Sequence, residues 1–431
     1  MKVAMYTPQL CYAGGIERVV KELFRIFGER GVQCCAVCEY GLPTWGELGC
    51  FACLPQKKEV RCEFLRKWLL AHKPDVFLFH YVKDEQFIYD VLKVLKELNI
   101  ASFAVMHSSF PSPLLLDGDE LLLWTFQRWA KYCNGIITVS KVDMVWWRAL
   151  GFRAWHIQNP FVHPKMNALH LSRSSETAPR KVLWVGRQAQ QKQPSAALAA
   201  FAAVTRTVPD AHLTMVGGSE AGWKRFRRQA KRLGLTEEQV TFLSERDDIS
   251  DLWEWADIHL LSSVTESFCL VLAEAKAWGK PTVMFEIPFL ELVESGKGLV
   301  SVPQGDIQAL ADGMVNLMTH PQRCQQLGKE ARESLTSFND DAVWRSWQKI
   351  LGGGDGLGNS LEEVDLPADV RVIITQMAFA WEDFCKRNLW AVVFVRNWRL
   401  LFGYSLKPIS QLLEWGIAVI RRVKRAVVQY V

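Results

Sequence analysis

The chain of 431 residues is 49% hydrophobic and 23% charged, with a formal net charge of +5 at pH 7. This composition is typical of a folded globular protein and excludes a mainly disordered one. The length exceeds what one hydrophobic core usually organises, so we expect two domains and an appended segment. The start of the chain lacks a signal-peptide pattern, and no stretch is long and apolar enough to cross a bilayer, which predicts a cytoplasmic protein.

The first half of the chain alternates strand-like and helical patterns. Residues 2–8 are predicted as a strand, 11–15 as a glycine loop, and 16–27 as a helix with one apolar face. Further strands are predicted at residues 34–38, 76–80, 102–107 and 135–139, with helical segments between them. This alternation predicts a doubly wound parallel sheet, a Rossmann-like domain over residues 1–165.

The pattern restarts after a proline-rich and polar stretch at residues 158–180, where we expect the link between domains. The predicted strands are residues 181–185, 213–216, 240–243, 258–261 and 282–285, and the predicted closing helices are 306–318, 321–334 and 338–351. The sequence therefore predicts an α/β protein whose second Rossmann-like domain spans residues 166–351. A glycine-rich linker and a helical tail follow over residues 352–431.

Two cations follow the first strand of the second predicted domain. Arg187 comes directly after Gly186 at the strand end, and Lys192 lies five residues further on at the start of a helix. Ligands of open α/β sheets bind beyond the carboxyl ends of the strands, so the two cations are placed to hold a diphosphate. The alternative is a pair of solvated cations in a surface loop.

Two carboxylates follow a later strand, at residues 258–261. Glu266 lies in the loop before an apolar helix, and Glu274 lies eight residues further on, so both project from nearly the same side. The backbone amides of residues 267–270 form the N-terminus of this helix and favour an anion. The alternatives are helix capping for Glu266 and a buried ion pair for Glu274.

These residues, with a glycine pair at 217–218, resemble the second domain of the family-four retaining glycosyltransferases of GT-B fold, the glycosyl transferases group 1. A glycine pair at 14–15 before a helix, His107 at a strand end and an Asn-Pro pair at 159–160 extend the resemblance over about residues 1–350. The resemblance implies the GT-B fold, two Rossmann-like domains facing each other across a cleft.

The resemblance also implies roles for the candidate residues. Arg187 and Lys192 would neutralise the donor diphosphate, and Glu266 would hold hydroxyls of the transferred sugar. Glu274 would bond the ribose, and His107 would lie close to the sugar; an ordinary polar edge residue is the alternative for His107. The other residues implied in donor binding bring backbone close to the donor: Gly14, Gly15, Gly186, Gly217, Ser267, Phe268, Cys269 and Leu270.

The chain departs from the family pattern at several positions. The family often has glycine where this chain has Gln193, Ser244, Ser267 and Cys269. Ser267 and Cys269 are small enough for close approach of the backbone to the donor, whereas Gln193 changes the reach of its loop. We therefore expect a donor fit that differs in detail.

The implied reaction transfers a hexose-type sugar from a nucleotide-sugar donor to a glycan or lipid-linked acceptor, in cell-surface polysaccharide or glycolipid synthesis. Similar enzymes retain the anomeric configuration without a clear protein nucleophile, so no catalytic base is assigned. The alternative function is a sugar-nucleotide-binding protein or an epimerase of the same fold without transferase activity. Nucleic-acid binding is disfavoured, because no recognition motif accompanies the basic residues.

No metal cofactor is expected. Asp117 and Asp119 resemble the metal-binding carboxylate pair of GT-A enzymes, but they precede an apolar helix, where acids cap the N-terminus. Two C-x2-C pairs, Cys35/Cys38 and Cys50/Cys53, have zinc-ribbon spacing, yet the first lies in a strand-like run. An odd total of eleven cysteines without a secretory signal predicts reduced thiols.

The end of the chain is basic and amphipathic. Residues 386–431 contain nine Lys or Arg and one acid, Glu414. One predicted helical face is apolar and the other carries arginines, the pattern of a helix that lies at an anionic membrane surface. The sequence therefore favours a peripheral location on the inner face of the cell membrane. The alternative is that these helices pack on the N-terminal domain.

Overall fold

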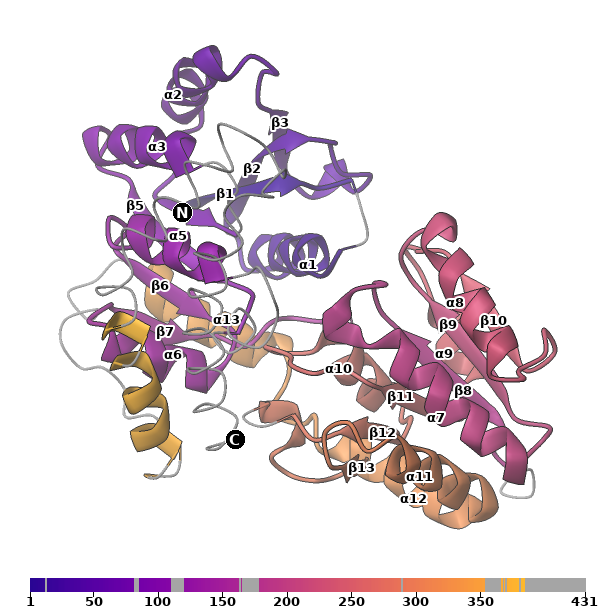
Figure 1. Ribbon diagram of the computed structural model, residues 1–431. Helices are drawn as coiled ribbons and strands as arrows, with labels where there is room; N and C mark the ends of the chain where they lie inside the picture. Colours follow the sequence, from indigo (N-terminus) through magenta and orange to yellow (C-terminus); the bar gives the residue numbers. More distant parts are fainter. Residues whose placement is uncertain are drawn as a thin grey trace, which may run out of the picture.

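The computed structural model describes residues 1–11, 14–80, 85–109, 120–162, 164, 178–287, 290–352, 366, 368, 370–379 and 381–383. Within these ranges the chain forms two parallel β-sheets flanked by helices (Figure 1). The predicted pair of doubly wound, Rossmann-like sheets is confirmed. The domain limits at residues 165 and 351 stay predictions, and residues 165–177 lie outside the described ranges.

The first sheet has seven strands in the order β3-β2-β1-β4-β5-β6-β7. All neighbouring pairs are parallel, and apolar side chains pack on both faces. The strands are β1 (Lys2–Gln9), β2 (Gln33–Tyr40), β3 (Cys50–Cys53), β4 (Val76–Phe79), β5 (Ala101–Met106), β6 (Gly135–Thr138) and β7 (Ala154–His156). The helices are α1 (Gly15–Glu29), α2 (Arg61–His72), α3 (Glu85–Glu97), α5 (Glu120–Ala130) and α6 (Lys141–Ala149).

The second sheet has six parallel strands in the order β10-β9-β8-β11-β12-β13. The strands are β8 (Lys181–Val185), β9 (His212–Val216), β10 (Val240–Leu243), β11 (Ile258–Leu261), β12 (Thr282–Phe285) and β13 (Leu299–Val302). The helices are α7 (Pro194–Thr207), α8 (Glu220–Arg232), α9 (Ser250–Trp255), α10 (Leu270–Ala277), α11 (Ile307–Thr319) and α12 (Pro321–Glu333).

The strands that the sequence pattern did not predict all lie at sheet edges. They are β3 and β7 at the two edges of the first sheet and β13 at one edge of the second. Each has only three or four residues. Short edge strands are half exposed and carry little apolar periodicity, so composition alone does not distinguish them from loops.

Helix α13 (Asp340–Leu351) belongs by sequence to the second predicted domain, but it packs against the first sheet (Figure 1). Trp347 is buried, and its ring lies 5.6 Å from that of Phe27 on α1, centroid to centroid. Arg25 of α1 donates to Asp340 at 2.8 Å. The chain therefore connects the two domains a second time, after the link that precedes β8.

The two C-x2-C pairs lie in neighbouring strands, in register: Cys35 pairs with Cys50, and Cys38 with Cys53. Because side chains alternate along a strand, Cys35 and Cys38 point to opposite faces of the sheet and join different apolar clusters. The four thiols therefore cannot surround one zinc ion. The cysteines of the described residues are free thiols.

Part of the C-terminal segment also packs on the first domain. Ile374 and Ala378 are fully buried there, and the Trp381 indole N–H donates to Gln127 Oε1 at 3.1 Å. The predicted basic tail, residues 386–431, lies outside the described residues, so both of its interpretations stay open. In the described part of the chain, no helix has the length and apolar character needed to cross a membrane.

Candidate active site

Three neighbouring strands bring the predicted residues of the second domain together. The strands are neighbours in the order β9-β8-β11. Gly217 follows β9, Arg187 follows β8 and Glu266 follows β11, so all three residues lie beyond the carboxyl ends of the strands. The loops after β8 and β9 touch. Gly217 has a φ of 124°, and a Cβ there would lie 2.3 Å from the Gly186 carbonyl oxygen, so only glycine fits.

Lys192 and Glu266 form a buried ion pair beyond these strand ends. The distance from Lys192 Nζ to Glu266 Oε1 is 2.6 Å, and the two side chains are 13% and 7% exposed. Burial alone lowers the pKa of Lys192, but the charge and hydrogen bond of Glu266 outweigh burial and raise it. The lysine is therefore charged. Glu266 is not the helix cap that one interpretation of the sequence proposed, since Cys269 occupies the N-cap of α10.

Arg187 is the exposed cation of the site. It has no ion-pair partner among the residues that the structure describes. Its positive charge opposes the increase in the pKa of Lys192 that Glu266 causes. A guanidinium with open hydrogen-bonding positions beside a second cation suits a diphosphate.

The segment that leads into α10 touches the first domain. Ser267 Oγ donates to the backbone carbonyl oxygen of His107 at 2.6 Å. Leu270, the first residue of α10, faces Gly15, the first residue of α1, and a Cβ on Gly15 would lie 3.7 Å from the leucine. Gly14 is the N-cap of α1. The positive ends of two helix dipoles therefore lie close together at the domain boundary.

Phe268 lies on the other side of this segment and is buried. Its ring centroid is 6.4 Å from that of Phe161, near the link between the domains, and 6.2 Å from that of Phe338, before α13. Phe268 therefore packs against both chain crossings rather than exposing its side chain to a ligand.

Glu274 lies in α10 and is buried, and its Oε1 contacts Arg18 of α1, in the opposite domain. The buried ion pair that one interpretation of the sequence proposed for Glu274 is therefore present, with a partner that the sequence did not identify. Burial raises the pKa of Glu274, and the charge of Arg18 opposes that increase. Its second oxygen, Oε2, is buried without a hydrogen-bond partner among the described residues.

His107 pairs with another histidine at the end of the adjacent strand. His80, which follows β4, has Nδ1 3.0 Å from His107 Nε2, and the rings are stacked at 22°. Burial lowers the pKa of His107 to about 4 and that of His80 well below its ordinary value. Both imidazoles are therefore neutral near pH 7 and act through hydrogen bonds.

Two residues of this set were absent from the sequence prediction. Arg18 lies one turn into α1, four residues after Gly14, and nothing local indicates its partner 256 positions away. His80 had the same signal as His107, a polar residue directly after a buried strand. The rule that ligands bind beyond the carboxyl ends of strands would therefore have identified His80 from the sequence.

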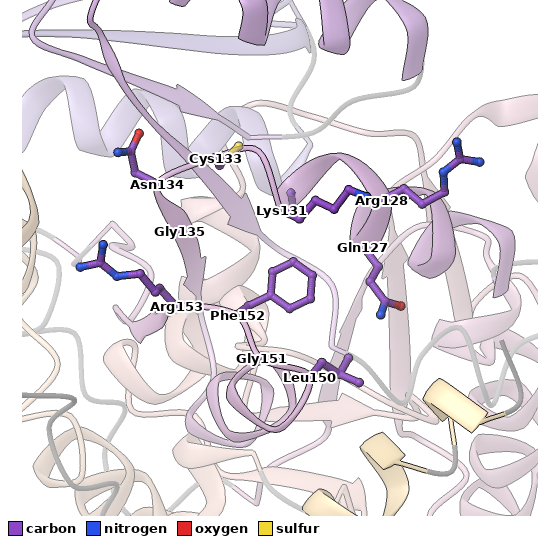
Figure 2. A pocket seen from close by; sticks show the side chains of 11 residues that line it. Gln127, Arg128, Lys131, Cys133, Asn134, Gly135, Leu150, Gly151, Phe152 and Arg153 are labelled. Atoms are coloured by element: carbon purple, nitrogen blue, oxygen red, sulfur yellow. The ribbon is translucent and has the colours of Figure 1, made fainter. Parts of the chain in front are cut away.

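Two cavities of the described residues lie away from these side chains. Figure 2 shows one of about 500 Å³ at the starts of β6 and β7, where Lys131, Phe152 and Arg153 line it. This is the amino end of the strands, opposite to the candidate residues. A second cavity of about 600 Å³ lies between the domains, where His156 Nε2 is 3.0 Å from Glu291 Oε1.

In the described ranges, no three His, Cys, Asp or Glu side chains gather as metal ligands would. Asp117 and Asp119 lie outside those ranges. Metal-independent activity therefore stays a prediction.

A double-mutant cycle tests the Lys192–Glu266 pair. We expect Lys192→Met and Glu266→Gln each to lower the free energy of unfolding by about 3 kcal/mol, because each leaves the partner buried without its counterpart. The double variant should lose less than the sum of the two single losses. Denaturant unfolding of the four proteins measures this coupling, and additive losses would contradict the pair.

Comparison with known proteins places this geometry in a family. Residues 179–320 match the family model of the glycosyl transferases group 1, and residues 13–162 match that of glycosyltransferase family 4. An uncharacterized glycosyltransferase of Haemophilus influenzae is 25% identical over 221 residues, 51% of this chain and 61% of that protein. A glycogen synthase of Mycobacterium tuberculosis is 32% identical over 181 residues, 42% of each chain. The matches thus span less than two thirds of these relatives.

Solved structures agree in fold. The Anabaena protein Alr3699/HepE, solved in complex with UDP and glucose, has a TM-score of 0.67 and 19% identity, covering 82% of this chain and all of that one. WaaG, a glycosyltransferase involved in lipopolysaccharide biosynthesis, has a TM-score of 0.65 and 14% identity, with the same coverage. The two family models together match more than half of the residues, one in each domain. The chain belongs to the group 1, family 4 glycosyltransferases and has their GT-B fold.

Proposed function

We propose that this glycosyltransferase moves a hexose-type sugar from a nucleotide-sugar donor to a glycan or lipid-linked acceptor, with retention of anomeric configuration. The process would be the synthesis of a cell-surface polysaccharide or glycolipid. One observation carries the proposal: Arg187, Lys192, Glu266 and Glu274 gather around the N-terminus of α10, where the N-terminus of α1 faces it. Two cations, two carboxylates and two helix dipoles match a sugar joined to a diphosphate.

The cations would act on the leaving group. As the nucleoside diphosphate departs, negative charge develops on its phosphate oxygens, and fixed cations and amides stabilise it. Arg187 is open to the ligand, whereas Lys192 is already held by Glu266. In this ion pair Lys192 would bind the diphosphate and Glu266 would bind the sugar hydroxyls. The pair would therefore fix the position of the sugar relative to the diphosphate.

The neutral histidine would contribute a hydrogen bond rather than a charge. His107 comes from the first domain, and its carbonyl oxygen is bonded to Ser267, next to Glu266. In this position the imidazole would contact the sugar from the side opposite to the carboxylate. No protein group is assigned as a base, since the departing phosphate would accept the acceptor proton on the same face.

A panel of sugar nucleotides tests the donor assignment. UDP-glucose is the first candidate, because the Anabaena neighbour was solved with UDP and glucose. We expect one sugar nucleotide to raise the melting temperature and to release its nucleoside diphosphate when an acceptor is present, with rates unchanged by a chelator. Stabilisation without transfer would favour a binding protein or an epimerase. No stabilisation by any nucleotide would contradict the donor site, and chelator-sensitive rates would contradict the metal-free mechanism.

The two charged groups should give different kinetic signatures. Glu274→Ala should mainly raise KM for the donor, because its contact with ribose is the same in the ground state and the transition state. Arg187→Ala should also lower kcat, by about tenfold or more, because the cation is used most as charge develops on the leaving group. Steady-state rates with the true donor measure both, and wild-type rates in both variants would place the active site elsewhere.

We also propose that the tail, residues 386–431, binds an anionic membrane surface near a lipid-linked acceptor. Its nine Lys or Arg residues against one acid support this. In vesicle cosedimentation, the full chain should bind anionic but not neutral vesicles, and less so at high salt. The control is a shortened chain that ends after Asp383 and so keeps Ile374, Ala378 and Trp381, which pack on the first domain. Equal sedimentation of the two chains, or an insoluble control, would favour packing of the tail on the first domain.

A further inference from the structure

The Glu274 carboxylate is buried with only one of its oxygens satisfied. Its side chain is 4% exposed, and Oε1 contacts the Arg18 guanidinium. Oε2 is inaccessible to solvent and accepts no hydrogen bond from the described residues. A buried carboxylate oxygen without a donor is unfavourable by more than the value of an ordinary hydrogen bond, so native structures seldom keep one. Oε2 is therefore an acceptor that a ligand hydroxyl can satisfy.

The cation that holds Oε1 comes from the other domain. Arg18 lies in the first turns of α1, and the Leu270 side chain against Gly15 sets the start of α1 beside the start of α10. The arginine side chain is 32% exposed, whereas the glutamate is almost completely enclosed. The pair therefore forms only where the two domains meet.

No other cation of the described residues acts on Glu274. The Trp253 indole of α9 lies beside the carboxylate and lowers its pKa as a hydrogen-bond donor does, and the Cys269 thiol lies at the start of α10. Asp248, before α9, interacts electrostatically with Arg18. Arg18 is thus the group on which the charge of Glu274 depends.

We propose that Arg18 is a positioning residue for the nucleotide: it holds Oε1 of Glu274 across the domain interface and so presents Oε2 to a ribose hydroxyl. This inference rests on the proposed donor role of Glu274. Each oxygen then has one partner, the guanidinium on one side and the ribose hydroxyl on the other. Recognition of the ribose by the second domain would require the first domain to be in contact with it.

The pH dependence of binding follows from the same contact. Burial raises the pKa of Glu274 and Arg18 lowers it, so loss of the arginine moves the pKa upward. The ionised carboxylate is the better acceptor for a hydroxyl. Without Arg18, binding should therefore weaken as pH falls from 8 to 6 by more than it does in the wild-type protein.

The test is UDP binding by calorimetry at pH 8, 7 and 6, with the full chain. We expect Arg18→Met to bind about tenfold more weakly at pH 7 and to lose further affinity at pH 6. Arg18→Lys, which keeps the charge, should restore most of the affinity and the wild-type pH profile. Lys21→Met is the matched control, since Lys21 is an exposed cation of the same helix, and it should bind as wild type. Arg18→Gln serves if the methionine variant does not fold.

The outcomes separate the two proposals. If wild-type protein binds neither UDP nor another nucleoside diphosphate, the proposed function fails and the role of Arg18 with it. If wild type binds UDP but the Arg18 variants bind equally well, or weaken by the same factor at every pH, only the positioning role is overturned. In a Glu274→Gln background, Arg18→Met should add no pH dependence, and an added dependence would also overturn it.

Discussion

The arrangement of the site depends on two carboxylates that the fold buries in and before α10. Glu266 and Glu274 have side chains that are 7% and 4% exposed, and a buried carboxylate without a cation is strongly unfavourable. Each is matched by one cation, Lys192 from the same domain and Arg18 from the opposite domain. The first pair fixes the loops within the second domain. The second pair makes the position of the first domain part of the electrostatics of the site.

The other contacts between the domains agree with this. Ser267 bonds the His107 carbonyl oxygen, Leu270 packs against the start of α1, and Phe268 packs beside both chain crossings. Four consecutive residues from 267 to 270 thus include three that face other parts of the interface. If this segment binds the donor through its amides, as proposed, its side chains connect donor binding to the position of the first domain. A substitution of one of these side chains would therefore also shift the backbone amides of the segment.

The sequence was sufficient to predict most of the fold and the site residues that the second domain contributes. Buried strands such as β8 and β11 have clear apolar runs, and the residues after them, including Arg187 and Glu266, could be placed at one sheet edge. Pairings across the domain boundary could not be predicted, because local periodicity contains no information about which side chain of α1 meets α10. Arg18 was missed for that reason. The edge strands β3, β7 and β13 were missed because partial exposure removes their apolar signal.

Two of the four described non-glycine residues with positive φ belong to the loops of the candidate site. Gln193 and Cys269 have φ values of 46° and 65°, a left-handed conformation that costs a non-glycine residue on the order of 1 kcal/mol. They flank the Lys192–Glu266 pair, at positions where the family often has glycine. Buried contacts hold the Gln193 turn, since Ser262 Oγ lies 2.8 Å from the Lys192 carbonyl oxygen and 3.1 Å from that of Gln193. The fold therefore maintains this loop geometry with side chains that do not favour it.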